Sequence, residues 1–421
     1  MKRLGLTQFI LITLFLFFIL AARSASAATH YVSTNGSASW SSCTVSNSPC
    51  SVSTALTNAI AGDTVNFLAG TYMITDNSSA YYAPALNPAN SGTSGNPITF
   101  QANPGDTVTL IGAYELQGLI GSYTRNYITW KGFIVDTSAY GDTGGQAVTL
   151  NSCTGVVFDG LTLIGHHYSN NASHWSAIYS GVGSTNTTIR NCKIYGWSSP
   201  GEGAAIGLFN ATGFLIENNE IYSNDRGISM LQSDSGTIRF NLIHDLSLGV
   251  HGPGNASNNS LNIYQNIFYN ISSKVLDIEA NWPSSYFYNN TIYNCPTGSG
   301  FWGIVTSTTS LTYYNNIYHT VTTPVSYNGV GIAYDDYNDF YNGGGKLSGF
   351  DANSMTTDPL FVNVTGHNFH LQPNSLARTY GQSGKAMGAY ISGSETIGLT
   401  SSTSSTGSTS TPGAPIGLMV Q

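Results

Sequence analysis

Few side chains in this chain of 421 residues are charged, and several of them fall between positions 225 and 279. Only 8% of the residues are Asp, Glu, Lys or Arg. The residues of this stretch that could do chemistry are Asp225, Arg226, His251, Lys274, Asp277 and Glu279. An imidazole or an amine can act as a general base, and a guanidinium can clamp a carboxylate. Two carboxylates can hold a cation that prefers oxygen ligands. Together these residue types suit acid–base chemistry on an anionic substrate, provided that the fold brings them together.

The feature that could bring them together is a repeat marked by asparagine. The segments TGFLIENNEIY, SGTIRFNLIHD, SLNIYQNIFYN, SSYFYNNTIYN and SLTYYNNIYHT each carry one Asn in the same context, at intervals of 22, 25, 24 and 26 residues. These are Asn219, Asn241, Asn266, Asn290 and Asn316. Such a period predicts stacked coils. Because a side-chain amide both donates and accepts hydrogen bonds, the column predicts an asparagine ladder from coil to coil.

Two further columns keep step with the ladder position, which is held by Phe133, Leu161 and Cys192 in the earlier coils. Two residues after the ladder position lies an apolar stripe: Val135, Leu163, Ile194, Ile221, Ile243, Phe268, Ile292 and Tyr318. Three residues after it lies a column that is mostly aromatic: Asp136, Ile164, Tyr195, Tyr222, His244, Tyr269, Tyr293 and His319. Neighbours in each column are expected about 4.8 Å apart, one strand spacing.

With these columns, the chain resembles the right-handed parallel β-helix proteins of the pectate-lyase-like superfamily. The segments GDTVNFLAGTY and SGTSGNPITFQANPGDTVTLIG resemble the opening of that fold, and TDPLFVNVTGHNFHLQPNSLA followed by MGAY resembles its end. The resemblance covers residues 30–391. It implies an all-β, right-handed parallel β-helix (solenoid) with an N-terminal cap, and polysaccharide as the partner. The paired Asp residues with a following Arg that mark lyases of this kind are not present, so no catalytic residue is carried over.

The chain divides into four parts. Residues 1–27 read as a signal peptide, with a basic start, an apolar run and Ala25-Ser26-Ala27 as the cleavage site, although the run is long enough to remain as an anchor. Residues 28–125 are expected to form an N-terminal cap and the first coils. Residues 126–391 hold the β-helix repeats and closing segment, and residues 392–421 are a Ser/Thr-rich disordered tail. We therefore expect a secreted or cell-surface protein.

The cap segment offers two local predictions. Residues 53–61 should form a short helix with Ser53 as N-cap. Cys43 and Cys50 flank a Ser/Pro turn and are expected to form a disulfide in an oxidising compartment. The remaining cysteines are expected to be buried thiols: Cys153, Cys192 and Cys295.

The charge balance limits the partners. The formal net charge is −8, and of the 13 Lys and Arg residues three lie at the extreme N-terminus, which leaves ten. Without a basic patch, nucleic acid is excluded as a partner. An acidic glycan would need local Arg or Lys, or a bridging cation such as Ca²⁺. We expect a monomer that engages a polysaccharide and no membrane after signal cleavage.

In the resembled enzymes, the site is a groove formed by one exposed strand face and the loops before it. The candidate strands here are residues 146–150, 176–180, 204–208, 227–231, 249–253, 275–279 and 301–305. Alternation then points one residue of each strand outward: Thr149, Tyr179, Gly207, Ser229, His251, Asp277 and Val305. This register places His251 beside Asp277, with Glu279 two residues along. Arg226, Asp225 and Lys274 are expected on the preceding loops, as are Glu202, His174 and Trp175 on earlier ones.

The favoured interpretation is a polysaccharide lyase acting on a uronate polymer. Arg226 would clamp the sugar carboxylate, and His251 or Lys274 would take the proton from the adjacent carbon. Asp277 and Glu279 would hold Ca²⁺. The other expected substrate contacts are Tyr179, Trp175, Glu202 and Ser229.

Three alternatives stay open. The cluster is also compatible with an ordinary polar outer face, where a His beside an Asp simply forms a hydrogen-bonded pair. A glycoside hydrolase could use paired carboxylates from Asp225, Asp277 and Glu279. A non-catalytic carbohydrate-binding or adhesive surface protein could use aromatic side chains along the groove, namely Tyr179, Trp175, Trp197, Trp282 and Trp302. Separately, DDYNDFYNGGG (335–345) resembles a calcium loop but lacks its Gly and terminal Glu, which favours a structural turn.

Overall fold

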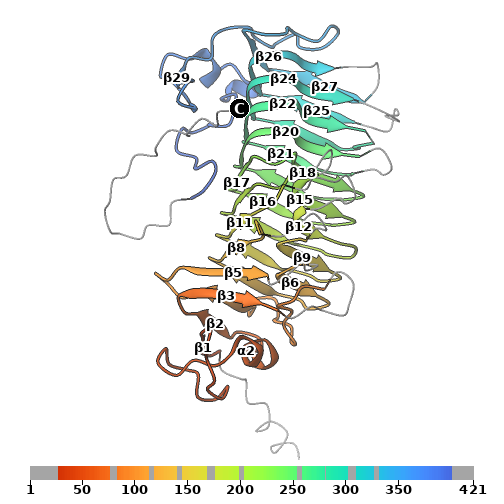
Figure 1. Cartoon of the computed structure of the whole chain (residues 1–421). Coiled ribbons are helices and arrows are strands. Elements are labelled where there is room, and N and C mark those ends of the chain that lie inside the picture. Colours follow the sequence, from red (N-terminus) through yellow and green to blue (C-terminus); the bar gives the residue numbers. More distant parts are fainter. Residues whose placement is uncertain are drawn as a thin grey trace, which may run out of the picture.

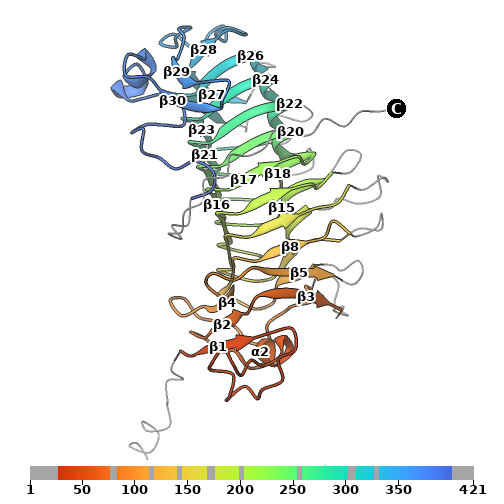
Figure 2. The ribbon, with the colours of Figure 1, turned by 60° about the vertical axis from the view of Figure 1, so that its left-hand side comes forward.

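A computed structural model describes residues 27–75, 83–112, 118–139, 145–167, 176–198, 203–253, 258–279, 281–301, 310–326 and 331–400. The predicted signal peptide therefore lies almost entirely outside the described residues. The chain forms one continuous stack of parallel β coils that ascends from the N-terminal to the C-terminal end (Figures 1 and 2). Within the described residues the fold is the predicted all-β solenoid.

One parallel sheet takes one strand from each coil along the stack. Among the described residues its strands, in spatial order, are β1 (Thr29–Val32), β2 (Thr64–Phe67), β4 (Ile98–Ala102), β7 (Ile128–Lys131), β10 (Val157–Asp159), β13 (Thr188–Arg190), β16 (Leu215–Glu217), β19 (Thr237–Arg239), β21 (Asn262–Tyr264), β23 (Ser285–Tyr288), β25 (Leu311–Tyr314) and β27 (Ile332–Asp336).

The second sheet starts as two separate faces that later merge. The first face comprises β3 (Gly70–Ile74), β5 (Val108–Gly112), β8 (Ile134–Asp136), β11 (Thr162–Ile164), β14 (Lys193–Tyr195) and β17 (Glu220–Tyr222). The other face comprises β6 (Ile120–Tyr123), β9 (Val148–Asn151), β12 (Ser176–Ser180), β15 (Ala204–Phe209) and β18 (Arg226–Leu231). Strand β20 (Leu242–Gly252) pairs with both β17 and β18, so it joins the faces. The faces stay joined through β22 (Ile267–Ile278), β24 (Thr291–Phe301) and β26 (Ile317–Ser326). The short strand β28 (Asp339–Tyr341) pairs only with the start of β26.

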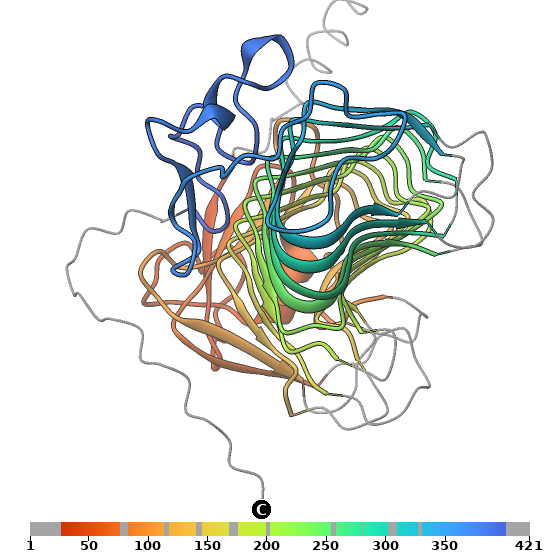
Figure 3. The same cartoon turned by 90° about the horizontal axis from the view of Figure 1, so that it is seen from above.

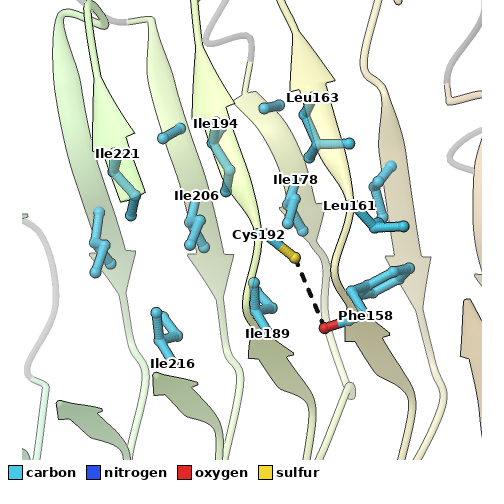
Figure 4. Packing of buried hydrophobic residues seen from close by; sticks show 14 of the residues in the cluster. Phe158, Leu161, Leu163, Ile178, Ile189, Cys192, Ile194, Ile206, Ile216 and Ile221 are labelled. Atoms are coloured by element: carbon cyan, nitrogen blue, oxygen red, sulfur yellow. Dashed lines mark hydrogen bonds between the residues drawn. The ribbon is translucent and has the colours of Figure 1, made fainter. Parts of the chain in front are cut away.

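The core includes the predicted apolar stripe. Leu163, Ile194 and Ile221 are paired in register on successive coils and are fully buried. Figure 4 shows these side chains stacked between the sheets, with the Cys192 thiol 3.8 Å from the carbonyl oxygen of Phe158. Fully burying one aliphatic side chain contributes about 1.5–3 kcal/mol, and the stack repeats this gain in each coil.

The asparagine column is continuous by hydrogen bonds. Each side-chain amide donates to the side-chain oxygen of the next Asn, at 2.9 Å from Asn219 to Asn241 and at 3.1 Å from Asn316 to Asn338. Asn338 was not part of the sequence-based column and extends it by one coil. Along the column the residue before each Asn has positive φ: Asn218, Phe240, Gln265, Asn289, Asn315 and Tyr337. This conformation is costly for a residue other than Gly, and the amide bonds help to offset it.

The acidic segment 335–339 takes part in the internal hydrogen bonding of the fold, which agrees with its interpretation as a structural turn. Asn338 donates a 2.7 Å hydrogen bond to Asp335 Oδ1, and both residues are buried. Burial raises the pKa of Asp335 to about 8, with Asp351 and Asp336 adding to the effect.

A C-terminal strap, residues 386–400, returns along the outside of the stack. It contacts the residue that precedes the ladder position in successive coils. Asn289 donates to the carbonyl of Ala386 at 2.8 Å, and Gly398 donates to the carbonyl of Phe240 at 2.8 Å. Further contacts pair Gln265 with Ala389, Asn218 with Thr396 and Asn191 with Thr400. These contacts extend to Thr400, past residue 391, where the Ser/Thr-rich tail was predicted to begin. Residues 401–421 lie outside the described part, and the disorder of the tail stays a prediction.

The segment before the strap folds against the side of the last coils, as the blue chain in Figure 3 shows. It contains the antiparallel pair β29 (Phe361–Asn363) and β30 (Asn368–Leu371), and the short helices η1 (Leu376–Arg378) and η2 (Gln382–Gly384). His367 stacks on Tyr269 with ring centroids 4.0 Å apart. This contact covers part of the aromatic column.

At the N-terminal end, helix α2 (Val52–Asn58) packs beside β1 (Figure 1). Its N-cap is Ser51, whose hydroxyl accepts from the Thr54 backbone N–H at 3.1 Å, so the prediction of Ser53 was wrong by two residues. None of the helices in the described residues has the length and apolar character needed to cross a membrane.

The predicted disulfide is not formed in this structure, where Cys43 and Cys50 are buried thiols. Burial raises the pKa of the Cys50 thiol to about 12, and the neighbouring Cys43 adds to the effect. Since the two thiols are adjacent, their pairing under oxidising conditions stays a prediction. The other three cysteines are buried thiols, as expected.

Candidate functional site

The outward column on β18, β20 and β22 follows the predicted register. Ser229 is paired with His251, and His251 with Asp277. The residues before them, Val250 and Leu276, are fully buried, so alternation along each strand turns His251 and Asp277 outward. The sequence-based prediction that His251 neighbours Asp277 is confirmed.

A parallel column supplies two cations. Arg226 is paired with Leu248, and Leu248 with Lys274. Both residues were predicted on the loops before these strands, and this was wrong. Arg226 is the first residue of β18, and Lys274 lies within β22. Seen along the stack, His251 therefore has Arg226 on the coil before it and Lys274 on the coil after it.

Asp277 is shared between an amine and the imidazole. Lys274 Nζ lies 2.5 Å from Asp277 Oδ1, and His251 Nε2 lies 3.9 Å from Asp277 Oδ2. His251 Nε2 also lies 3.6 Å from Glu279 Oε1, and its Nδ1 is 3.4 Å from the Ser229 hydroxyl. The imidazole thus directs one nitrogen at a hydroxyl and the other at two carboxylates.

Glycine at the next coil makes room for Lys274. Asp277 is paired with Gly300, where a Cβ atom would lie 2.7 Å from Lys274 Cδ. The prediction that Val305 follows Asp277 in this column was wrong. Strand β24 runs unbroken from Thr291 to Phe301 and so reaches this position earlier in the sequence; Val305 lies outside the described residues.

Burial sets the charge states at the site. The side chains of His251 and Asp277 are only 4% and 5% exposed, while that of Glu279 is 38% exposed. Burial lowers the pKa of His251 below 6.5, and Arg226 adds to this, against the opposing effect of Asp277 and Glu279. Burial also lowers the pKa of Arg226, but a guanidinium stays charged in proteins. The geometry therefore presents a neutral imidazole between two cations.

Asp225 lies beside this group. Its Oδ2 accepts a 3.2 Å hydrogen bond from the Gly203 backbone N–H, and its charge opposes the lowering of the Arg226 pKa. With Asp277 and Glu279 it brings the carboxylates of the site to three, against two permanent cations.

The aromatic predictions have mixed outcomes. Tyr179 lies on the same outward column as His251, and its ring stacks on Phe209 with centroids 5.0 Å apart. Phe209 was missed, although it points outward by the same alternation, two residues after Gly207. Trp197 and Trp282 are fully buried, so they cannot contact sugar as predicted. Four further candidates lie outside the described residues, namely Trp175, Glu202, His174 and Trp302.

One group among the described residues could hold a metal ion. One ligand atom each from His251, Asp277 and Glu279 lies within 4.8 Å of the others. Ca²⁺ takes six to eight oxygen ligands. This group offers one nitrogen, and Lys274 is already bound to Asp277, so its donor set fits the predicted Ca²⁺ poorly.

Comparisons with known proteins agree with the fold. Residues 123–292 match the family model described as "Right handed beta helix region". The crystal structure of pectate lyase Pel9A superposes with a TM-score of 0.67 at 17% sequence identity, covering 86% of this chain and 96% of that chain. The complex of XylC with xylose gives 0.52 at 12% identity, covering 79% and 86%. The GH136 lacto-N-biosidase from Eubacterium ramulus gives 0.51 at 12% identity, covering 80% and 67%. A search of curated protein sequences found no match. Identities this low show a shared right-handed β-helix fold.

Proposed function

We propose that this right-handed parallel β-helix protein cleaves an acidic polysaccharide by β-elimination at the His251 site. The observation that carries the proposal is the position of the His251 imidazole, between the coil that carries Arg226 and the coil that carries Lys274, with the Arg226 charge close enough to lower its pKa. A uronate polymer offers a carboxylate to such cations and an acidic C–H beside that carboxylate.

Each step of the reaction has a residue to perform it. Arg226 pairs with the sugar carboxylate and makes the C5 proton more acidic. His251 Nε2 takes that proton, the C4–O4 bond breaks, and the electron pair of the C–H bond forms a C4=C5 double bond. The departing O4 takes a proton from Lys274 or from water. The products are a new non-reducing end with an unsaturated uronate and a new reducing end, whose anomeric hydroxyl keeps the departing oxygen.

The contacts of Lys274 favour His251 over Lys274 as the base. Lys274 Nζ lies 2.5 Å from Asp277 Oδ1, in an ion pair between an ammonium and a carboxylate. A protonated amine can stabilise negative charge or donate a proton, but it cannot accept one. His251 has a lowered pKa and Ser229 at its other nitrogen, which suits an oriented, neutral base.

The surrounding residues supply recognition. Tyr179 and Phe209 offer apolar ring surface on the same face. Tyr179 lies three coils before His251 along the chain, and Phe209 lies two coils before it. Trp175 and Glu202 remain proposed contacts. The names of the three similar structures refer to pectate, xylose and lacto-N-biose, which supports a carbohydrate as the substrate class and, with it, a secreted protein.

Glycoside hydrolysis is the second candidate, because the carboxylate oxygens of Asp277 and Glu279 lie within 4.8 Å of each other. Retaining glycosidases hold their two carboxyl groups about 5–5.5 Å apart. Elimination is favoured over hydrolysis because Asp277 is buried and bound to Lys274, which hinders its attack on a sugar carbon.

The test is a substrate panel of pectin, alginate and glycosaminoglycans, each with Ca²⁺ and with a chelator. Elimination creates an unsaturated uronate, so ultraviolet absorbance should rise with wild-type protein and not with His251→Ala. The matched control is Glu220→Gln, outside the site on the same sheet. Reducing ends without absorbance would make the protein a hydrolase, and binding without either product would make it a carbohydrate-binding protein; both results overturn the proposal.

A further inference from the structure

We propose that His251, Asp277 and Glu279 form a binding site for a divalent transition-metal ion of the Zn²⁺ or Co²⁺ kind, and that the bound ion switches off the proposed elimination. The ion would be held by His251 Nε2, Asp277 Oδ2 and Glu279 Oε1. The inhibitory half rests on the proposed function, whereas the binding half stands on geometry alone.

The separations between the ligand atoms suit a shared ion. His251 Nε2 lies 3.9 Å from Asp277 Oδ2 and 3.6 Å from Glu279 Oε1. Both distances exceed the range of about 2.7–3.2 Å for an N–H···O hydrogen bond. In tetrahedral geometry, two ligand atoms that each lie about 2.0–2.2 Å from one ion are about 3.3–3.6 Å apart. Side-chain shifts of under about 1 Å would therefore complete the site.

The donor set selects the class of metal. One imidazole nitrogen with two carboxylate oxygens suits Zn²⁺ and its neighbours in the first transition row, whereas Ca²⁺ and Mg²⁺ prefer oxygen alone. Imidazole binds these ions through the lone pair of the neutral ring. The site also has three carboxylates against two permanent cations, so a divalent ion would offset the remaining negative charge.

Neighbouring side chains already orient two of the three ligands. Lys274 occupies Asp277 Oδ1, which leaves Oδ2 turned toward the imidazole. The Ser229 hydroxyl lies 3.4 Å from His251 Nδ1, which leaves Nε2 turned toward the carboxylates. Outer contacts of this kind fix ligand direction in metal sites. Glu279 is the most exposed ligand and provides the side from which an ion can enter.

Another histidine on the same strand shows that flanking carboxylates alone are not enough. His244 Nδ1 lies 2.7 Å from Asp245 Oδ2, while its Nε2 lies 3.7 Å from Glu220 Oε1. The two carboxylates face different nitrogens, on opposite edges of the ring, so they cannot converge on one ion. Across the residues that the structure describes, the His251 group is the only set of three such ligands found within reach of one another.

The consequence for catalysis is direct competition for one lone pair. A metal-bound Nε2 cannot accept the C5 proton, so a bound ion removes the base while leaving Arg226 in place. The protein should therefore be active after treatment with a chelator and inactive when Zn²⁺ occupies the site. Removing Zn²⁺ should restore product formation.

The binding half is tested by titrating chelator-treated, full-length protein with Co²⁺ and recording its visible absorption. We expect one ion per chain, displaced by Zn²⁺. His251→Ala and Asp277→Asn should abolish the signal, and Lys274→Met should weaken binding about 10–100-fold as an outer contact. Glu279→Gln is the deciding variant, because its side chain is partly exposed and the change preserves shape. Its matched control is Glu220→Gln, a carboxylate 3.7 Å from the other histidine, which should bind Co²⁺ like the wild type.

The outcomes separate this inference from the proposed function. No Co²⁺ absorption, or equal binding by wild type and Glu279→Gln, overturns the metal site whether or not the protein is a lyase. Co²⁺ binding without activity on any substrate supports the site and overturns both elimination and its inhibition. Activity that Zn²⁺ abolishes in the wild type, and that a chelator restores, supports both halves.

Discussion

Two histidines on strand β20 have the same kinds of charged neighbours, but the neighbours are arranged differently around each ring. His244 and His251 each lie near two carboxylates, and a lysine joins one carboxylate in each group: Lys193 is 3.6 Å from Glu220, and Lys274 is 2.5 Å from Asp277. The His244 ring is stacked between Tyr222 and Tyr269, at 5.1 and 4.5 Å. The His251 ring has no such stack among the described residues, and one of its nitrogens faces both of its carboxylates.

The difference shows that the residue types around a histidine do not mark a reactive site. What marks it is that both carboxylates face the same ring nitrogen. At His244 each nitrogen has its own carboxylate, so the ring is fixed in a column whose rings support one another. At His251 three acceptor or donor atoms surround a single point that a proton or a metal ion can occupy. A search by residue type alone would rank the two groups equally.

The largest contrast should appear in activity. His251→Ala should lower the rate of product formation about 10²–10⁴-fold, the usual contribution of a general base. His244→Ala should keep that activity once the protein is folded, because His244 is part of the aromatic column on the other face. Initial rates at saturating substrate, measured at a temperature where both variants are folded, decide this; equal losses would show that the comparison is wrong.

The two lysines should differ in their effect on stability. Lys274→Met leaves the buried Asp277 without its closest cation and should cost about 3 kcal/mol, the lower end for breaking a buried ion pair. Lys193→Met removes a pair whose lysine is 38% exposed, and should change stability by less than about 1 kcal/mol. Urea unfolding of the two variants beside the wild type measures both values. Similar losses would mean that the pair at Asp277 is as solvated as the one at Glu220.

For the aromatic stack, stability should depend on His244, with an effect smaller than that of Lys274. His244→Ala removes ring contacts with Tyr222 and Tyr269, each contributing about 0.5–1.5 kcal/mol, so the free energy of unfolding should fall by about 1–3 kcal/mol. His244→Phe, which restores a ring between the two tyrosines, should recover part of this loss. If His244→Phe is no better than His244→Ala, stacking is not what fixes this histidine.

The smallest effect is a pH dependence. The contact with His244, with Lys193 adding to it, lowers the pKa of Glu220 below its ordinary 4.5. A lowered carboxyl pKa stabilises the fold above the ordinary pKa, and this contribution is lost as the pH falls through the folded-state value. The stability difference between wild type and Glu220→Gln should therefore shrink between about pH 5 and pH 3. Thermal unfolding at several pH values checks it; a constant difference would contradict the assignment.

The coil register could be predicted from the sequence because identical turn positions must stack in phase. Asn241 and Asn266 fix the phase of two neighbouring coils. That phase alone would pair His251 with Leu276, and a one-residue register shift between Leu246 and Leu248 pairs it with Asp277. The pairing could still be predicted because the apolar residues Val250 and Leu276 must both point inward. The aromatic and apolar columns were predicted from the phase of the coils. The directions of the side chains within the site could not be predicted. Nothing in the sequence shows that one oxygen of Asp277 faces Lys274 and the other faces His251.

The predicted register was wrong where glycine residues allow close packing between coils and do not form a turn. The strand was predicted at residues 301–305, yet β24 already runs through the glycine-containing segment CPTGSG before it. A Cβ at Gly298 would lie 2.4 Å from the Pro324 carbonyl oxygen, and one at Gly300 would lie 2.7 Å from Lys274. The buried tryptophans have a similar cause: Trp282 packs where a Cβ at Gly252 would lie 2.5 Å from its ring. Such close approaches appear only once the coils are stacked.

The C-terminal strap has a consequence for how the molecule comes apart. In a stack of repeats each coil contacts only its neighbours, so coils can peel from an end one at a time. The strap bonds to Asn191, Asn218, Phe240, Gln265 and Asn289, at the coils that also carry Arg226, His251 and Asp277. Peeling any one of these coils must also release its bond to the strap. The strap thereby turns a series of separate local openings into one cooperative event, and the part of the stack that it makes cooperative is the part that holds the site.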